Sequence, residues 1–189
     1  MAPGPVLLGG WSLGGMVALE LTARKLLPVD RLLLFATTPR FTAAADWSHG
    51  LPEIQVRALR RNLERRFETT LADFFALAFA AGEVSADRLR AIRAFAVRPG
   101  GVPDRAAAAA CLDLLAGQDQ RDLLPAIHCP ALVVHGQADR VTPVAAGRAL
   151  AAALPHGNLL ELPETGHAPF WTQLPTVVRA VAEFCAWDR

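Results

Sequence analysis

A serine stands between two glycines near the start of the chain. The stretch Gly10-Trp11-Ser12-Leu13-Gly14 follows the apolar run 6–9 and precedes a run with helix-forming composition that begins at Met16. This is the G-x-S-x-G pattern of a nucleophile elbow, in which the serine occupies a strained turn between a strand and a helix. Glycines two residues before and after the serine would let strand and helix pass without Cβ clashes. The pattern makes Ser12 a candidate nucleophile and the Leu13 N–H a candidate oxyanion donor, although a glycine-rich turn without chemistry also fits the pentapeptide alone.

A serine nucleophile needs a base, and the base needs a carboxylate that holds its tautomer. Asp139 follows the apolar run 131–136, and His167 follows the run 158–162. Residues that follow parallel strands gather at one edge of the sheet, where ligands bind. A turn-capping aspartate and a loop histidine would each explain one residue. The three together, in the order serine, aspartate, histidine, favour a catalytic triad.

The other histidines and acids fit these roles less well because of where they stand along the chain. Asp119 and Asp122 precede a strand and would lie at its wrong end. His135 ends a strand and has no loop of its own after it. The remaining histidines lie in loops, in the predicted cap or before the last strand: His49, His128 and His156.

The elements that must position these residues alternate as in a parallel α/β sheet. Segments that read as strands occupy residues 6–8, 31–36, 131–136 and 158–162, of which 31–36 is a continuous apolar run, and helical patterns occupy residues 13–27, 145–154 and 175–187. Continuous apolar runs are typical of parallel strands covered on both faces. The sequence predicts an α/β fold with a parallel sheet of about four strands, in which the strand at 6–8 is buried.

Residues 40–116 have a different character, with several helical patterns and no convincing strand. We expect this segment to form a helical cap inserted into a core made of residues 1–39 and 117–189. A group of large apolar side chains within it fits a core or a pocket wall better than a cofactor box: Leu71, Phe74, Phe75, Leu77 and Phe79.

Arginines also cluster in this segment, at Arg57, Arg60, Arg61, Arg65 and Arg66, with Glu64 as the only acid between the first and the last. On a helix, residues 57, 61 and 65 share one stripe. A solvated helix face and a dock for an anion or an acidic protein are both consistent with this pattern.

The composition excludes several classes of protein. The 189 residues fit one domain, and 19 Lys and Arg against 18 Asp and Glu give no global charge for nucleic acid or a membrane surface. Three widely spaced cysteines form neither a disulfide framework nor a metal pattern, so a reducing cytoplasm is expected. Glycine-rich nucleotide loops are also absent, and no cofactor is expected. The first 23 residues lack Lys and Arg but carry Glu20, which fits neither a signal peptide nor a membrane span.

Four stretches, taken together, resemble a known family. They are Leu8-Gly9-Gly10-Trp11-Ser12-Leu13-Gly14-Gly15; Phe35-Ala36-Thr37-Thr38-Pro39-Arg40-Phe41 with Asp46-Trp47; His135-Gly136-Gln137-Ala138-Asp139-Arg140-Val141; and Gly166-His167-Ala168-Pro169-Phe170. The chain resembles the α/β-hydrolases and, among them, the pimeloyl-ACP methyl ester carboxylesterases of biotin biosynthesis.

The resemblance implies Ser12 as nucleophile, His167 as base, Asp139 as its orienting acid and the Leu13 N–H as one oxyanion donor. It also implies a helical lid over an apolar acyl channel, with Trp11 and Phe75 in the pocket. A basic lid surface would bind acyl carrier protein, a role that Arg57, Arg60, Arg61 and Arg65 could fill. The expected function is that of a serine carboxylester hydrolase that acts through an acyl-enzyme.

The resemblance covers only the later part of the family's usual length. The early strands and the loop with the second oxyanion donor are not in this sequence, so we expect a fragment or a wrongly assigned start codon. The strand before Ser12 would then be an open apolar edge through which chains could self-associate. Two alternatives therefore stay open beside the carrier-linked esterase: a generalist hydrolase of small esters or C–C bonds, and a truncated, non-catalytic, self-associating module.

Overall fold

The structure is a computed structural model that describes residues 4–98, 100–101 and 103–186. In this part of the chain four strands form one parallel sheet in the order β1-β2-β3-β4. They are β1 (Leu7–Trp11), β2 (Arg31–Phe35), β3 (Ala131–Gly136) and β4 (Gly157–Leu162). The predicted parallel α/β architecture is confirmed.

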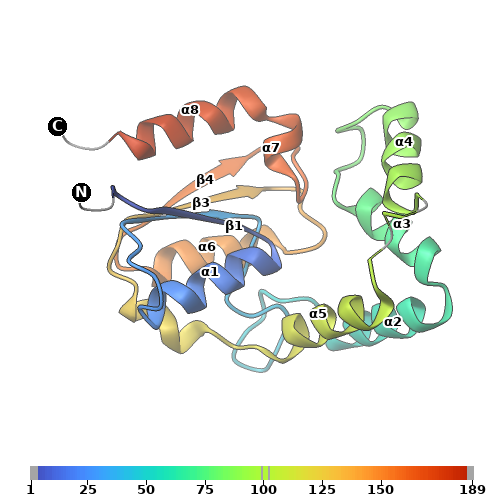
Figure 1. Cartoon of the computed structure of the whole chain (residues 1–189), viewed down its shortest axis with the longest axis horizontal. Coiled ribbons are helices and arrows are strands. Elements are labelled where there is room, and N and C mark those ends of the chain that lie inside the picture. Colours follow the sequence, from blue (N-terminus) through green and yellow to red (C-terminus); the bar gives the residue numbers. More distant parts are fainter. Residues whose placement is uncertain (1–3, 99, 102, 187–189) are drawn as a thin grey trace.

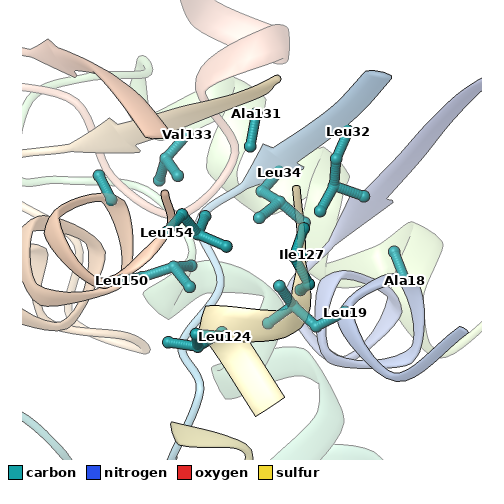
Figure 2. Packing of buried hydrophobic residues seen from close by; sticks show 11 residues of the cluster. Ala18, Leu19, Leu32, Leu34, Leu124, Ile127, Ala131, Val133, Leu150 and Leu154 are labelled. Atoms are coloured by element: carbon teal, nitrogen blue, oxygen red, sulfur yellow. The ribbon is translucent and has the colours of Figure 1, made fainter. Parts of the chain in front are cut away.

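Helices cover both faces of this sheet (Figure 1). α1 (Leu13–Ala23), α6 (Val144–Ala153) and the short 3-10 helix η1 (Arg121–Ala126) pack on one face, and α7 (Pro169–Thr172) and α8 (Leu174–Cys185) belong to the other. Figure 2 shows Leu34, Ile127 and Leu150 filling the space between the sheet and the first group of helices. Because the central strands are covered on both faces, all six residues of β3 are buried.

β1 lies at the edge of the sheet and differs from its prediction in two ways. The strand runs on through two glycines to Trp11, whereas the sequence predicted an end at residue 8. It is also not fully buried, since Leu7 and Trp11 are 39% and 38% exposed. β1 pairs with β2 on one side, and the described chain contains no strand on its other side.

The helix after Ser12 is shorter than predicted. The sequence favoured a helix over residues 13–27, but α1 ends at Ala23 because Lys25 takes a positive φ of 54°. The predicted helices at 145–154 and 175–187 correspond to α6 and α8 with small shifts at their ends. Residue 187 lies outside the described residues.

Four helices stand between β2 and η1, beyond the carboxyl ends of the strands (Figure 1): α2 (Glu53–Arg65), α3 (Phe67–Leu77), α4 (Ala86–Ala96) and α5 (Arg105–Gly117). We call residues 40–116 the cap segment. A separate apolar cluster includes Phe41, Val56 and Leu112 from this segment together with Val141, which follows β3. The cap segment therefore packs directly on the loop that carries Asp139.

The two connections between the sheet and the cap segment, one after β2 and one before η1, are joined by hydrogen bonds. The Gln120 N–H donates to the Pro39 carbonyl at 2.8 Å, and Arg121 contacts the carboxylates of Asp119 at 2.7 Å and Asp46 at 2.8 Å. The hydrogen bond from Arg121 holds the pKa of Asp119 well below its ordinary value. This network closes the base of the cap segment.

Candidate active site

Ser12 lies at the sharp turn between β1 and α1. Its backbone has φ 53° and ψ −122°, a conformation that non-glycine residues rarely adopt. Its N–H donates to the Phe35 carbonyl at 3.0 Å, which holds the turn against the end of β2. The Leu13 N–H belongs to the first turn of α1, whose N–H groups lack acceptors within the helix. The strained serine predicted from the sequence is present, with a potential oxyanion donor beside it.

Two glycines make this turn possible, Gly10 and Gly15, whereas the pattern indicated Gly10 and Gly14. A Cβ on Gly10 would lie 2.4 Å from the Gly14 carbonyl oxygen, as expected for a close strand–helix crossing. A Cβ on Gly14 would meet nothing within 4 Å, so the predicted steric need at this position is wrong. The need falls on Gly15, where a Cβ would lie 2.6 Å from the Thr37 hydroxyl oxygen. That hydroxyl donates to the Ser12 carbonyl at 2.7 Å and braces the elbow.

His167 and Asp139 form a hydrogen-bonded pair. The His167 Nδ1 lies 2.8 Å from the Asp139 Oδ2, and both side chains are almost completely buried. The His167 Nε2 is buried and has no hydrogen-bond partner in the described chain. A histidine whose Nδ1 is held by a carboxylate keeps its Nε2 available for proton transfer.

The Asp139 carboxylate is surrounded by donors. Its Oδ1 accepts the backbone N–H groups of Val141 at 2.8 Å and Thr142 at 2.9 Å, so the loop after β3 wraps around it. Its Oδ2 lies 2.8 Å from the Thr142 hydroxyl and 3.3 Å from the His135 Nε2. Burial raises the pKa of Asp139, but the hydrogen bonds of His135 and His167 outweigh burial and hold this pKa well below its ordinary value. Asp139 is therefore an anion at neutral pH.

His135 and Thr142 were not predicted as site residues. His135 is fully buried, and its Nε2 lies 2.8 Å from the Thr142 carbonyl oxygen, to which it donates. Its Nδ1 is buried without a partner in the described chain. The only sequence signal was the place of His135 at the end of a strand, four residues before Asp139.

An apolar cavity of about 340 Å³ brings the elbow and His167 together. Ser12, Leu13 and His167 form one part of its wall, with Trp11 beside them. Phe41, Val141 and side chains of α2, α3 and α5 form the rest; the helices contribute Leu59, Leu63, Leu71, Phe74, Phe75, Ala108, Cys111, Leu112 and Leu115. Trp11 and Phe75, both predicted from the sequence as pocket residues, line this cavity.

A second apolar cavity has a volume of about 400 Å³. Trp11 and Phe75 line both cavities, so the two spaces share these two residues in their walls. α4 and α7 supply much of the remaining wall, which includes Ile92, Phe95, Phe170 and Trp171, and Arg88 is its one charged residue in the described chain.

The predicted arginine cluster lies on α2 and just after it, and its members differ in their partners. Arg57 pairs with Glu53 at 2.9 Å, and Arg60 pairs with Asp113 of α5 and with Glu64. All four arginines predicted to dock a carrier, including Arg61 and Arg65, are exposed. The described structure contains no ion pair for Arg61 or Arg65, so these two keep their charges available.

Neither a metal-binding cluster nor a membrane-spanning helix is found among the described residues. No group of three or more His, Cys, Asp or Glu side chains there is arranged to hold a metal ion. None of the helices there is long and apolar enough to cross a membrane.

Known proteins resemble this chain over nearly its whole length. The family model described as "alpha/beta hydrolase fold" matches residues 2–174. A pimeloyl-[acyl-carrier protein] methyl ester esterase of Chromobacterium violaceum is 38% identical over 184 residues, which are 96% of this chain and 70% of that protein. The esterase of the same name from Stenotrophomonas maltophilia is 36% identical over 182 residues, again 96% of this chain and 70% of that protein.

A solved structure supports the same fold. The esterase from Exiguobacterium antarcticum superposes with a TM-score of 0.82 at 23% identity, covering 93% of this chain and 65% of that one. The chain thus spans about 70% of the length of the two curated relatives and slightly less than two-thirds of that solved esterase. On the sequence match and the shared fold, this chain belongs to the α/β-hydrolase family and, within it, to the family of the pimeloyl-[acyl-carrier protein] methyl ester esterases.

Proposed function

We propose that this protein is a serine carboxylester hydrolase that acts through an acyl-enzyme on a pimeloyl-[acyl-carrier protein] methyl ester. The observation that carries the proposal is the buried pair of Asp139 and His167: the His167 Nε2 has no partner in the described chain, and His167 lines the same cavity as Ser12. This is the arrangement that activates a serine hydroxyl. The names of the curated relatives supply the substrate.

In the proposed reaction the Ser12 hydroxyl attacks the ester carbonyl while the His167 Nε2 takes its proton. Asp139 stays ionised and stabilises the imidazolium that forms. The Leu13 N–H donates to the oxyanion of the tetrahedral intermediate. Collapse of this intermediate breaks the bond between the carbonyl carbon and the methoxy oxygen. This oxygen takes the proton from His167 and leaves as methanol. Water then attacks the acyl-enzyme by the same steps and releases the carboxylic acid and Ser12.

The apolar wall of the cavity supports the proposal that the substrate carries an apolar acyl chain. Its wall beyond the elbow is almost entirely aliphatic and aromatic, and it contains the rings of Phe74 and Phe75. A chain of methylenes gains about 0.8 kcal/mol for each CH₂ that it buries. We further propose that residues 40–116 act as the lid over this chain, with the exposed Arg57, Arg60, Arg61 and Arg65 as the docking face for acidic acyl carrier protein. A cytoplasmic location is supported by three cysteines that are all free.

Covalent labelling of Ser12 tests the catalytic part of the proposal. A fluorophosphonate probe should modify Ser12, identified by peptide mass spectrometry, and Ser12→Ala should abolish both labelling and ester hydrolysis. Ser48→Ala removes an exposed serine of the cap segment and is the matched control, which should retain both. A protein that leaves Ser12 unlabelled and turns over no ester would refute the proposal.

Substrate specificity needs its own experiment, because the same site would serve a generalist hydrolase of small esters. The protein should release methanol from a pimeloyl-carrier methyl ester and restore growth of a biotin auxotroph that lacks its esterase. A generalist would hydrolyse short p-nitrophenyl esters yet fail to restore growth. That result would keep the serine chemistry and remove the carrier-linked substrate.

A further inference from the structure

The loop that carries His167 is held by the cap segment, and not only by the sheet. The His167 backbone N–H donates to the Ala78 carbonyl at 2.7 Å, just after the end of α3. The His167 carbonyl accepts the indole N–H of Trp11 at 2.8 Å. Both backbone polar groups of His167 are therefore bound by residues far away in the sequence.

One carboxylate completes this attachment. The Glu83 Oε2 accepts the Gly166 N–H at 2.8 Å and the Ala80 N–H at 2.6 Å. Its Oε1 accepts the hydroxyl of Thr172 from α7. Glu83 thus joins its own loop, the residue directly before His167, and the short helix that follows the histidine.

The contact between the two loops is tight. A Cβ on Gly166 would lie 2.5 Å from the Ala78 carbonyl oxygen and 3.0 Å from the Glu83 Oε2. The backbone of the histidine loop therefore lies directly against the loop between α3 and α4. Two consecutive N–H groups, those of Gly166 and His167, point at acceptors in the cap segment.

We propose that Glu83 is a positioning residue, whose carboxylate fixes the loop of His167 so that its Nε2 is placed for proton transfer from Ser12. The inference rests on the proposed serine hydrolase function. It gives one side chain of the cap segment, Glu83, a part in placing the base, because its carboxylate holds the N–H of Gly166 directly before His167. Nothing in the local sequence around Glu83 signals this role, since its partners lie up to 89 residues away.

Glu83→Ala and Glu83→Gln test the proposal with a p-nitrophenyl ester as substrate. Alanine removes both acceptor oxygens, and glutamine places an N–H₂ group against donors. We expect kcat to fall about 10- to 100-fold with KM changed less than about twofold, since a displacement near 1 Å of a reacting group can cost about 100-fold. Asp87→Asn, a change at an exposed carboxylate at the start of α4, is the matched control and should leave kcat unchanged.

A proton spectrum provides a readout that does not depend on turnover. The hydrogen-bonded Nδ1–H of His167, assigned by its loss in His167→Ala, should shift or broaden in both Glu83 variants and stay in place in Asp87→Asn. If the parent protein hydrolyses no ester, the proposed function fails while this signal still tests Glu83. An unchanged signal together with kcat within about twofold of the parent would overturn the inference.

Thr172 keeps the test available if the Glu83 variants fail to fold, as judged by circular dichroism. Thr172→Val removes one donor from Glu83 and should lower kcat by a smaller factor, about threefold to tenfold for one lost hydrogen bond. Thr172→Ser keeps the hydroxyl and should restore kcat. Equal kcat in both Thr172 variants and the parent would also count against the inference.

Discussion

A Cβ atom on Gly147 would lie 2.3 Å from the Nδ1 of His135. The backbone of α6 therefore packs directly on the buried imidazole whose Nε2 lies 3.3 Å from the Asp139 Oδ2. Gly147→Ala should displace this ring, lower the free energy of unfolding by about 1–3 kcal/mol and lower kcat. Thermal denaturation measures the first effect, with an expected fall in Tm of about 2–4 °C for each kcal/mol.

Gly117→Ala is the control for this prediction, because a Cβ at the last residue of α5 meets nothing within 4 Å. Its free energy of unfolding should stay within about 0.5 kcal/mol of the parent. Equal Tm values for the Gly147 and Gly117 variants would contradict the prediction, because they would show that α6 accommodates the added methyl group without loss of stability.

The elbow offers a second pair of matched glycines. Gly15→Ala places a methyl group against Thr37, whose hydroxyl holds the Ser12 carbonyl, and should move the nucleophile. We expect ester hydrolysis to fall by about 100-fold or more. Gly14→Ala adds a methyl in open space at an exposed position of α1 and should leave the fold unchanged. Circular dichroism and labelling of Ser12 compare the two, and loss of labelling in both variants would refute the distinction between them.

The ionisation of Asp139 predicts a pH dependence of stability. Hydrogen bonds from His135 and His167 hold its pKa below the ordinary value despite burial, so the folded protein keeps the carboxylate charged. A lowered folded-state pKa contributes stability above the unfolded-state value of about 3.9 and loses it as the pH falls through the folded-state value. Urea denaturation at a series of pH values should show that the advantage of the parent over Asp139→Asn shrinks from pH 7 to pH 3. An advantage that grows toward acid would contradict the assignment.

The charges of α2 predict a selective effect on carrier-linked substrate. Arg61→Glu with Arg65→Glu reverses two exposed cations that have no ion pair in the described structure. KM for a pimeloyl-carrier methyl ester should rise about tenfold or more at low salt and less at high salt, since ions screen exposed charges. Hydrolysis of a neutral p-nitrophenyl ester should not change. Arg179→Glu on α8 is the control, and a rise in KM there of the same size would place the carrier elsewhere.

Because Phe75 lines both apolar cavities, its truncation should change the chain-length preference of the enzyme. Its ring lines both spaces, so Phe75→Ala should connect them. The ratio of kcat/KM for long over short p-nitrophenyl esters should rise about 10-fold, as expected when one or two additional methylenes find room. Ala76→Gly on the same helix is the control for helix stability, since its residue lines neither cavity. An unchanged ratio would mean that Trp11 alone separates the cavities.

The sequence by itself determined the order of strands and helices, the parallel sheet and the three residues of the candidate triad. Apolar runs and glycine turns are local signals, and the places of Ser12, Asp139 and His167 after strands follow from them. Where burial or a turn depended on neighbours, the prediction failed. β1 lies at the edge, as predicted, but is not buried as predicted, since Leu7 and Trp11 are partly exposed there, and α1 ends early because Lys25 turns the chain.

Only the tertiary structure decided which side chains support the triad. His135 and Thr142 contact the Asp139 carboxylate because the loop after β3 folds around it, and no periodicity links Glu83 of the cap segment to the amide of Gly166. The choice between Gly14 and Gly15 likewise depends on where Thr37 lies after β2. Local patterns specify elements because each follows from neighbouring residues. The hydrogen bonds of the Asp139 carboxylate with His167 and of the Gly166 N–H with Glu83 form only when the packing of those elements brings distant donors and acceptors together.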